Sequence, residues 1–132
     1  MKYLLDTNIC IYLIKRKSPQ VLKKLIQQDI SNIGISSITL SELEYGVEKS
    51  AHKEQNKLAL TEFFAPLNVL PYDDRVAPVY GKIRAFLEKE GLTIGPVDML
   101  IGAHALSLKT VLVTNNHREF ERIPGLKVEN WI

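Results

Sequence analysis

The sequence contains a single cysteine, Cys10, so it forms no internal disulfide and carries no cysteine-cluster metal site. Such cysteine usage is typical of cytosolic proteins, and we expect a cytoplasmic location. No uninterrupted apolar run approaches the ~18 residues that a membrane span needs. The first 17 residues are interrupted by Asp6 and end in Lys15, Arg16 and Lys17, whereas a secretory signal peptide has its positive charges first. We therefore expect neither a membrane protein nor a disulfide-stabilised secreted one.

A large excess of charge of one sign is also absent. The 17 Lys and Arg residues against 15 Asp and Glu residues give a formal net charge of +2, which permits a nucleic-acid partner without indicating one. Hydrophobic residues make up 45% of the chain, which is too apolar for a protein that is mainly disordered. With 132 residues, no linker and no repeat, the sequence predicts a single domain over residues 1–132.

Short apolar runs alternate with longer amphipathic segments along the chain. The short runs predict strands at residues 3–5, 33–36, 68–70 and 110–114, with an edge strand around Val128. The longer segments predict helices at residues 9–15, 19–28, 37–49, 52–64, 73–90 and 97–108, the fifth of them capped by Asp73 or Asp74. This alternation predicts an α/β fold in which a central, mostly parallel sheet has helices on both faces. Ligand sites in such folds lie at the carboxyl ends of the strands, so residues that follow strands are the first candidates.

Three acidic residues stand in unusual positions. Asp6 directly follows the first predicted strand, Glu42 lies on a partly apolar helix face, and Asp98 is the only acid in an otherwise apolar helix. A carboxylate on an apolar face is costly unless it is paired or protonated, and no Lys or Arg lies within a helical turn of Glu42 or Asp98. Convergence on a shared divalent cation would satisfy all three. Each also has an ordinary explanation: Asp6 as a helix cap, Asp98 as a first-turn acid favoured by the helix dipole, and Glu42 as an edge residue in solvent.

Other patterns are weaker. The three histidines, His52, His104 and His117, are too scattered for a zinc site, and His104 between two alanines is typical of a packed helix residue. The chain has no glycine-rich phosphate loop and no motif around a Ser or Cys nucleophile. A basic cluster at residues 15–17, with Lys23 and Lys24, is typical of a solvated face, although it could approach a phosphate backbone.

The three acids lie within recognisable motifs, and a fourth motif follows them. The motifs are LDTNI at residues 5–9, SSITLSELEYG at residues 36–46, IGPVDMLIGAHA at residues 94–105 and LVTNNHREF at residues 112–120. In this order and spacing they resemble the four motifs of PIN-domain nucleases, over essentially the whole chain. Within that family the sequence is most similar to the VapC ribonuclease toxins of VapBC toxin–antitoxin modules, in their enteric-like subgroup. The resemblance implies a PIN-like fold of three layers.

The resemblance also implies an endoribonuclease that depends on Mg²⁺, for which Mn²⁺ can substitute. It implies that Asp6, Glu42 and Asp98 are metal ligands, since each of them matches the acid of its motif. Many PIN domains have Asp two residues after the Thr of the fourth motif, where this chain has Asn116. Either the Asn116 carbonyl or a water contacts the ion, or Glu119 supplies the missing carboxylate. These residue types suit Mg²⁺, which takes oxygen ligands, keeps several waters and is commonly held by one or two carboxylates.

Partners and substrate follow from the resemblance as well. It implies a VapB-type antitoxin, a homodimer that contacts DNA only through the antitoxin, and an RNA substrate, initiator tRNA cleaved in its anticodon loop. A single-stranded loop suits an enzyme that must splay bases apart to reach a phosphate. Two alternatives stay open, a receiver-like signalling domain and a catalytically silent PIN scaffold. A receiver needs an acidic pair after its first strand, where this chain has one Asp, and the three intact acids argue against a silent scaffold.

Overall fold

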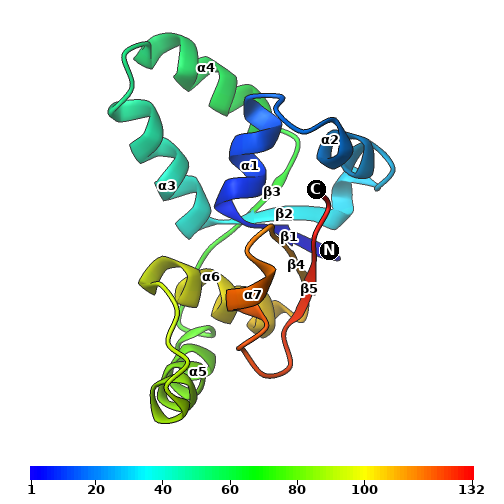
Figure 1. Cartoon of the computed structure of the whole chain (residues 1–132). Helices are drawn as coiled ribbons and strands as arrows, with labels where there is room; N and C mark the ends of the chain where they lie inside the picture. Colours follow the sequence, from blue (N-terminus) through cyan, green and yellow to red (C-terminus); the bar gives the residue numbers. More distant parts are fainter.

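The structure, a computed structural model, describes all 132 residues, and its strands and helices alternate along the chain (Figure 1). The strands are β1 (Tyr3–Leu5), β2 (Ile33–Ser36), β3 (Asn68–Leu70), β4 (Val111–Val113) and β5 (Lys127–Glu129). The α-helices are α1 (Thr7–Ile14), α2 (Pro19–Ile26), α3 (Ser37–Glu48), α4 (Lys53–Phe64), α5 (Ala77–Glu90), α6 (Pro96–Leu108) and α7 (His117–Phe120), and a 3-10 helix (Ile30–Asn32) precedes β2. The predicted α/β fold is confirmed. No helix has both the length and the apolar character to cross a membrane.

The five strands form one sheet in the order β3-β2-β1-β4-β5, and every neighbouring pair is parallel. The register places Leu5 opposite Ile35 on one side and Val113 on the other. The chain therefore leaves the three central strands at the same level. Asp6 and Thr114, which each follow one of these strands, meet at the carboxyl edge of the sheet.

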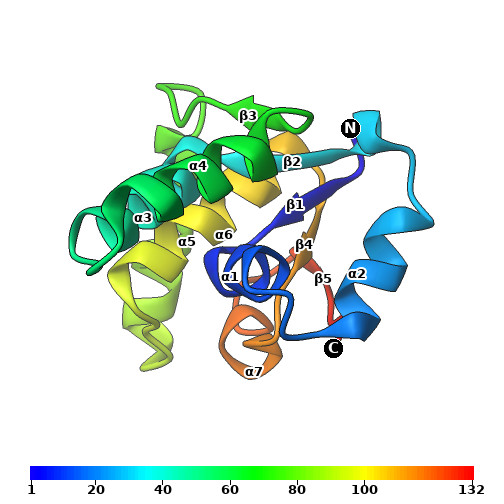
Figure 2. The same cartoon turned by 90° about the horizontal axis from the view of Figure 1, so that it is seen from above.

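Helices cover both faces of the sheet, so the fold has the three layers that the resemblance implies (Figure 1). Tyr3 and Leu5 of β1 point to the face covered by α1, α2, α3 and α4, whereas Leu4 points to the face covered by α5, α6 and α7. This alternation gives the molecule two separate hydrophobic cores. The helices α3 and α4 form a hairpin that packs beside α1 (Figures 1 and 2).

The start of one predicted helix is wrong. The sequence favoured a helix from Asp73 or Asp74, but α5 begins at Ala77 and has no side-chain cap. Asp73 instead closes a turn, because its Oδ1 accepts a hydrogen bond from the backbone N–H of Arg75 at 3.0 Å. Pro78 explains the later start: proline fits the first turn of a helix, where no N–H partner is needed, and disrupts the interior.

Candidate active site

Asp6 serves both as a helix cap and as a buried carboxylate at the sheet edge. It is the N-cap of α1, where its Oδ1 accepts a hydrogen bond from the backbone N–H of Ile9 at 3.0 Å. Its Oδ2 accepts a hydrogen bond from the Thr114 hydroxyl. The side chain is almost fully buried, with 4% of the residue exposed. Asp6 is therefore a helix cap, as one of the two explanations requires. Because both of its oxygens accept hydrogen bonds, its carboxylate is also fixed in place.

Asp98 lies in the first turn of α6, as a helix-dipole explanation requires, but it is partly buried and has a specific partner. The Nδ2 of Asn116 donates a hydrogen bond to the Oδ2 of Asp98 at 3.2 Å. The backbone N–H of Asn116 donates to the Thr114 hydroxyl at 2.9 Å, and that hydroxyl donates to Asp6. A continuous chain of hydrogen bonds therefore joins Asp98 to Asp6 through the residues that follow β4.

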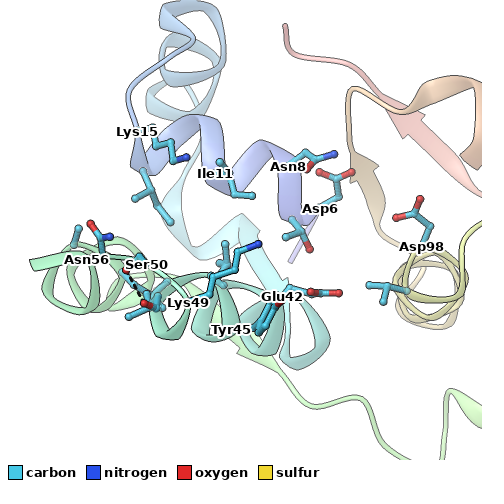
Figure 3. A pocket seen from close by; sticks show the side chains of 18 residues that line it. Asp6, Asn8, Ile11, Lys15, Glu42, Tyr45, Lys49, Ser50, Asn56 and Asp98 are labelled. Carbon is cyan, nitrogen blue, oxygen red and sulfur yellow. Dashed lines mark hydrogen bonds between the residues drawn. The ribbon is translucent and has the colours of Figure 1, made fainter. Parts of the chain in front are cut away.

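Glu42 approaches the same space from α3 and is partly buried. Figure 3 shows its carboxylate pointing toward Asp98, with Asp6 on the third side of the space between them. Glu42 takes part in no salt bridge. Beside it, the Thr7 hydroxyl donates to the Thr39 hydroxyl at 3.3 Å and joins the start of α1 to α3. The three acids singled out in the sequence thus come from the N-cap of α1, from α3 and from α6, and they face one another.

Burial and mutual repulsion both act on these carboxyl groups. Burial raises the pKa of Asp6, against the hydrogen bonds from Thr114 and the backbone. The pKa of Asp98 is also raised, first by burial and then by the negative charges of Asp6 and Glu119, while its hydrogen bond from Asn116 acts in the opposite direction. The charge of Glu42 contributes to the same upward shift of the Asp98 pKa. A bound cation would offset this repulsion.

The two candidates for the fourth position act differently. Asn116, just after β4, contacts Asp98 directly. Glu119 lies on the short helix α7, partly buried, and affects Asp98 through its charge rather than through a contact. The sequence placed Asn116 at the carboxyl edge beside Asp6. It does lie at that edge, and its side chain is directed to Asp98.

The donor set fits a hard divalent cation. The side chains that face one another carry carboxylate and amide oxygens, the ligands that Mg²⁺ prefers. The structure contains no group of three or more His, Cys, Asp or Glu side chains that could hold a metal ion. Mg²⁺ does not need such a cage, since it commonly takes one or two carboxylates and completes its shell with water. The fit is therefore to an open site with a partly hydrated ion.

A cavity of about 670 Å³ extends from these acids between α1, α3 and α4. Asp6, Glu42 and Asp98 line one end, and Lys15, Lys49 and polar side chains line the other (Figure 3). Its walls between the two ends are largely apolar; they include Ile11, Ile14, Leu43, Val47, Ala59 and Leu60. Size, openness to solvent and a few convergent polar groups are the features expected of a ligand site.

Four residues that contribute to the site or its cavity were not singled out in the sequence. Thr114 was quoted only as part of the fourth motif and was included in the predicted strand at residues 110–114, whereas β4 ends at Val113 and leaves Thr114 at the edge of the sheet. Lys49 lies seven residues after Glu42, which puts both on one helix face. The pairing of Thr7 with Thr39 had no signal in the sequence, because it depends on how α1 packs against α3.

The histidines do not contribute to this site. His104 is buried in the second core, where its Nδ1 hydrogen-bonds the Ser36 hydroxyl at 2.8 Å, as expected for a packed helix residue. His117 pairs with Glu121 on the surface at 2.8 Å. They lie on different elements from His52, which precedes α4.

Comparison with known proteins extends these observations. The family profile described as PIN domain matches residues 3–126. A protein of Salmonella typhimurium named tRNA(fMet)-specific endonuclease VapC is 47% identical over 131 residues, which cover 99% of this chain and 98% of that protein. The crystal structure of DNA-bound VapBC from Salmonella typhimurium contains a chain that is 46% identical and superposes with a TM-score of 0.95, covering 100% of this chain and 99% of that one. VapBC2 from Rickettsia felis, bound to a DNA fragment from its promoter, gives 42% identity and a TM-score of 0.93 with both chains fully covered.

Proposed function

The chain belongs to the PIN-domain family and to its VapC ribonucleases, and from that premise we propose that it is the toxin of a type II toxin–antitoxin pair, an endoribonuclease that requires Mg²⁺. Its substrate in this proposal is initiator tRNA, cut in the anticodon loop in the cytoplasm. A single PIN domain over residues 1–132 carries the activity. The observation that supports this most is the convergence of Asp6, Glu42 and Asp98 on one end of an open cavity, where none of them forms a salt bridge.

Asp6 and Asp98 would hold the cation, with Glu42 as a further ligand either directly or through water. Their oxygens are the hardest donors in the cavity, and their charges repel one another in its absence. A cation held there would supply Lewis acidity, which would make a bound water a better nucleophile and offset negative charge on the phosphate oxygens. No protein nucleophile is needed, which agrees with the absence of a Ser or Cys motif.

The other side chains keep this arrangement in place. The Thr114 hydroxyl orients Asp6, and the Asn116 amide orients Asp98, so that both carboxylates are held before substrate arrives. Glu119 adds negative charge from one side, which favours a cation next to Asp98. Asn116 therefore acts on the ion through Asp98 in this proposal, and Glu119 acts at longer range.

The proposed partner is a VapB-type antitoxin. The two relatives of known structure described above are VapBC complexes, and each was solved on DNA. We expect an antitoxin Arg to reach the acidic end of the cavity, since a guanidinium bonds two carboxylate oxygens while it replaces the charge of a metal. We also expect this chain to form a homodimer and to contact DNA only through the antitoxin.

The test is cleavage of initiator tRNA by the purified chain, with Mg²⁺ or with EDTA. Asp98→Asn removes one charge from the site, and Asp74→Asn removes one charge from an exposed residue before α5. We expect cleavage in Mg²⁺ and none in EDTA, with a loss of about 100-fold or more in Asp98→Asn, the scale for losing a preorganised electrostatic group. Asp74→Asn should cleave like the wild type. Mapping the cut ends identifies the phosphodiester.

Two outcomes would contradict the proposal. Cleavage that persists at the wild-type rate in folded Asp98→Asn would place the active site elsewhere. Binding of RNA or of an antitoxin without any cleavage in Mg²⁺ or Mn²⁺ would favour the catalytically silent scaffold.

A further inference from the structure

The end of the cavity opposite the acids carries two unpaired cations. Lys15 and Lys49 are the only cationic side chains in the cavity lining, and both are exposed. Neither takes part in a salt bridge. The neighbouring lysines of the α3–α4 hairpin do, since Lys53 pairs with Glu48 and Lys57 pairs with Glu44. Lys15 and Lys49 thus keep their charge available to a ligand.

An exposed aromatic ring lies between this basic end and the acids. Tyr45 is the only aromatic residue in the cavity lining, and 60% of it is exposed. The amino group of Lys49 lies over its ring, 4.9 Å from the centroid. This cation–π contact positions the lysine but leaves its N–H donors free. Figure 3 shows Tyr45 and Lys49 on the same side of the cavity as Glu42.

Helix geometry sets the separation between the two ends. Asp6 is the N-cap and Lys15 the C-cap of α1, nine residues apart, which corresponds to about 13 Å along the helix. Glu42 and Lys49 are seven residues apart on α3, or about 10 Å. These are separations along the backbone. Figure 3 shows the Lys49 amino group reaching along the cavity toward Glu42, whereas the Lys15 amino group lies further from the acids. The two amino groups suit phosphates next to the one that the acids would act on.

We propose that Lys15, Lys49 and Tyr45 form a binding subsite for single-stranded RNA, in which the lysines contact phosphates that flank the cleaved one and the Tyr45 ring stacks on a base. The inference rests on the proposed ribonuclease function and adds the residues that align the strand. Lysines act as point charges on phosphates, and an exposed ring accepts any base by stacking. The acidic end alone repels RNA, so a basic end at a fixed distance gives the strand one preferred position.

The test uses the full chain and a labelled eight-nucleotide single-stranded RNA, with affinity measured by fluorescence anisotropy in EDTA. We expect Lys15→Ala and Lys49→Ala each to weaken binding by roughly 3- to 10-fold and to reduce the slope of log Kd against log salt by about 0.7. Tyr45→Ala should weaken binding by about 5-fold or more, whereas Tyr45→Phe keeps the ring and should bind normally. Lys82→Ala, on the exposed face of α5, is the matched control and should match the wild type.

Cleavage gives a second, independent measurement. The three alanine variants should raise KM for the eight-nucleotide RNA with little change in kcat, and should cleave a dinucleotide, which is too short to reach them, like the wild type. If the wild-type chain cleaves RNA but Lys15→Ala and Lys49→Ala keep its RNA affinity and KM, the inference is overturned and the proposed function stands. If the variants lose RNA affinity as expected but the wild-type chain does not cleave RNA, the subsite is supported and the proposed function is overturned.

Two further outcomes also overturn the inference. Failure of the wild-type chain to bind the RNA at low salt would remove its basis. Loss of affinity for an antitoxin peptide alone, with RNA affinity unchanged, would make this surface a protein-docking face.

Discussion

The two ends of the cavity are built in different ways. At the acidic end, Asp6 and Asp98 are fixed by hydrogen bonds from Thr114, Asn116 and the backbone, and the residues lie at a sheet edge that five parallel strands define. At the basic end, Lys15 and Lys49 lie on exposed helix ends without a salt bridge, and Lys49 alone contacts a partner, the exposed ring of Tyr45.

The difference corresponds to two roles, action on the reacting phosphate and attraction of the neighbouring phosphates. A group that acts on a reacting phosphate must be held within a fraction of an ångström, which requires buried hydrogen bonds. A group that only attracts a phosphate can act as a mobile charge, and its contribution falls with added salt. Variants at the acidic end should therefore change the rate of cleavage, whereas variants at the basic end should change affinity.

The largest expected effect comes from removing one charge at the acidic end while its scaffold stays. In Asp6→Asn the amide oxygen can still cap α1, because Asn and Asp are equally good N-caps. We expect cleavage to fall by about 100-fold or more, with the free energy of unfolding unchanged or higher because a buried charge is gone. Asp6→Ala should lose the same activity and also about 1 kcal/mol of cap energy.

Cleavage rates and urea unfolding of the two Asp6 variants decide this. Wild-type cleavage by Asp6→Asn would remove the distinction between the two ends. Equal stabilities of the two variants would show that the cap contributes nothing to folding.

An intermediate effect is expected from removing the scaffold while the charges stay. Thr114→Val deletes the hydroxyl that bonds Asp6 and the Asn116 backbone, and leaves the buried Asp6 carboxylate and the Asn116 N–H without that partner. We expect a loss of about 1–3 kcal/mol in unfolding free energy and a drop in cleavage of about 10- to 100-fold.

Thr110→Val is the matched control. Thr110 is buried as well, but it lies at the other end of β4 from Thr114, and its hydroxyl donates to the Ala105 carbonyl at 3.2 Å. Its loss should reduce stability without the drop in cleavage rate. If both Thr variants lose activity to the same degree, Thr114 supports folding in general and does not specifically orient Asp6.

The fold could be predicted from the sequence because each element has a local signal. The run of Val111, Leu112 and Val113 between polar residues predicts a buried strand, and Gly91 correctly predicts the end of α5 in a left-handed conformation. The start of α5 was wrong because two acids near a turn resemble helix caps. Asp73 bonds its own turn instead. The 3-10 helix at Ile30–Asn32 was not predicted, because three residues are too few to show a helical period in the sequence.

The acidic end could be predicted in part for a related reason. Asp6 follows a strand, and parallel strands bring their carboxyl ends together, so one rule locates it. Lys15 and Lys49 follow no such rule. Both line one cavity because α1 packs against α3 and α4, and no local sequence pattern predicts that packing.

The smallest expected effect lies at the edge of the acidic end, where Asn116 and Glu119 compete for the fourth position. Asn116 contacts Asp98 with a neutral amide, whereas Glu119 acts through its charge across partly exposed space. Glu119→Gln should therefore raise the Mg²⁺ concentration for half-maximal cleavage by about 2- to 5-fold, the scale of a screened charge interaction. Asn116→Asp should lower that concentration or leave it unchanged, because a carboxylate beside Asp98 adds attraction for the cation. Glu121→Gln, an exposed neighbour that pairs with His117, is the control and should titrate like the wild type. If Glu119→Gln also titrates like the wild type while Asn116→Ala is inactive, Glu119 is a surface residue, and Asn116 alone completes the rigid end of the cavity.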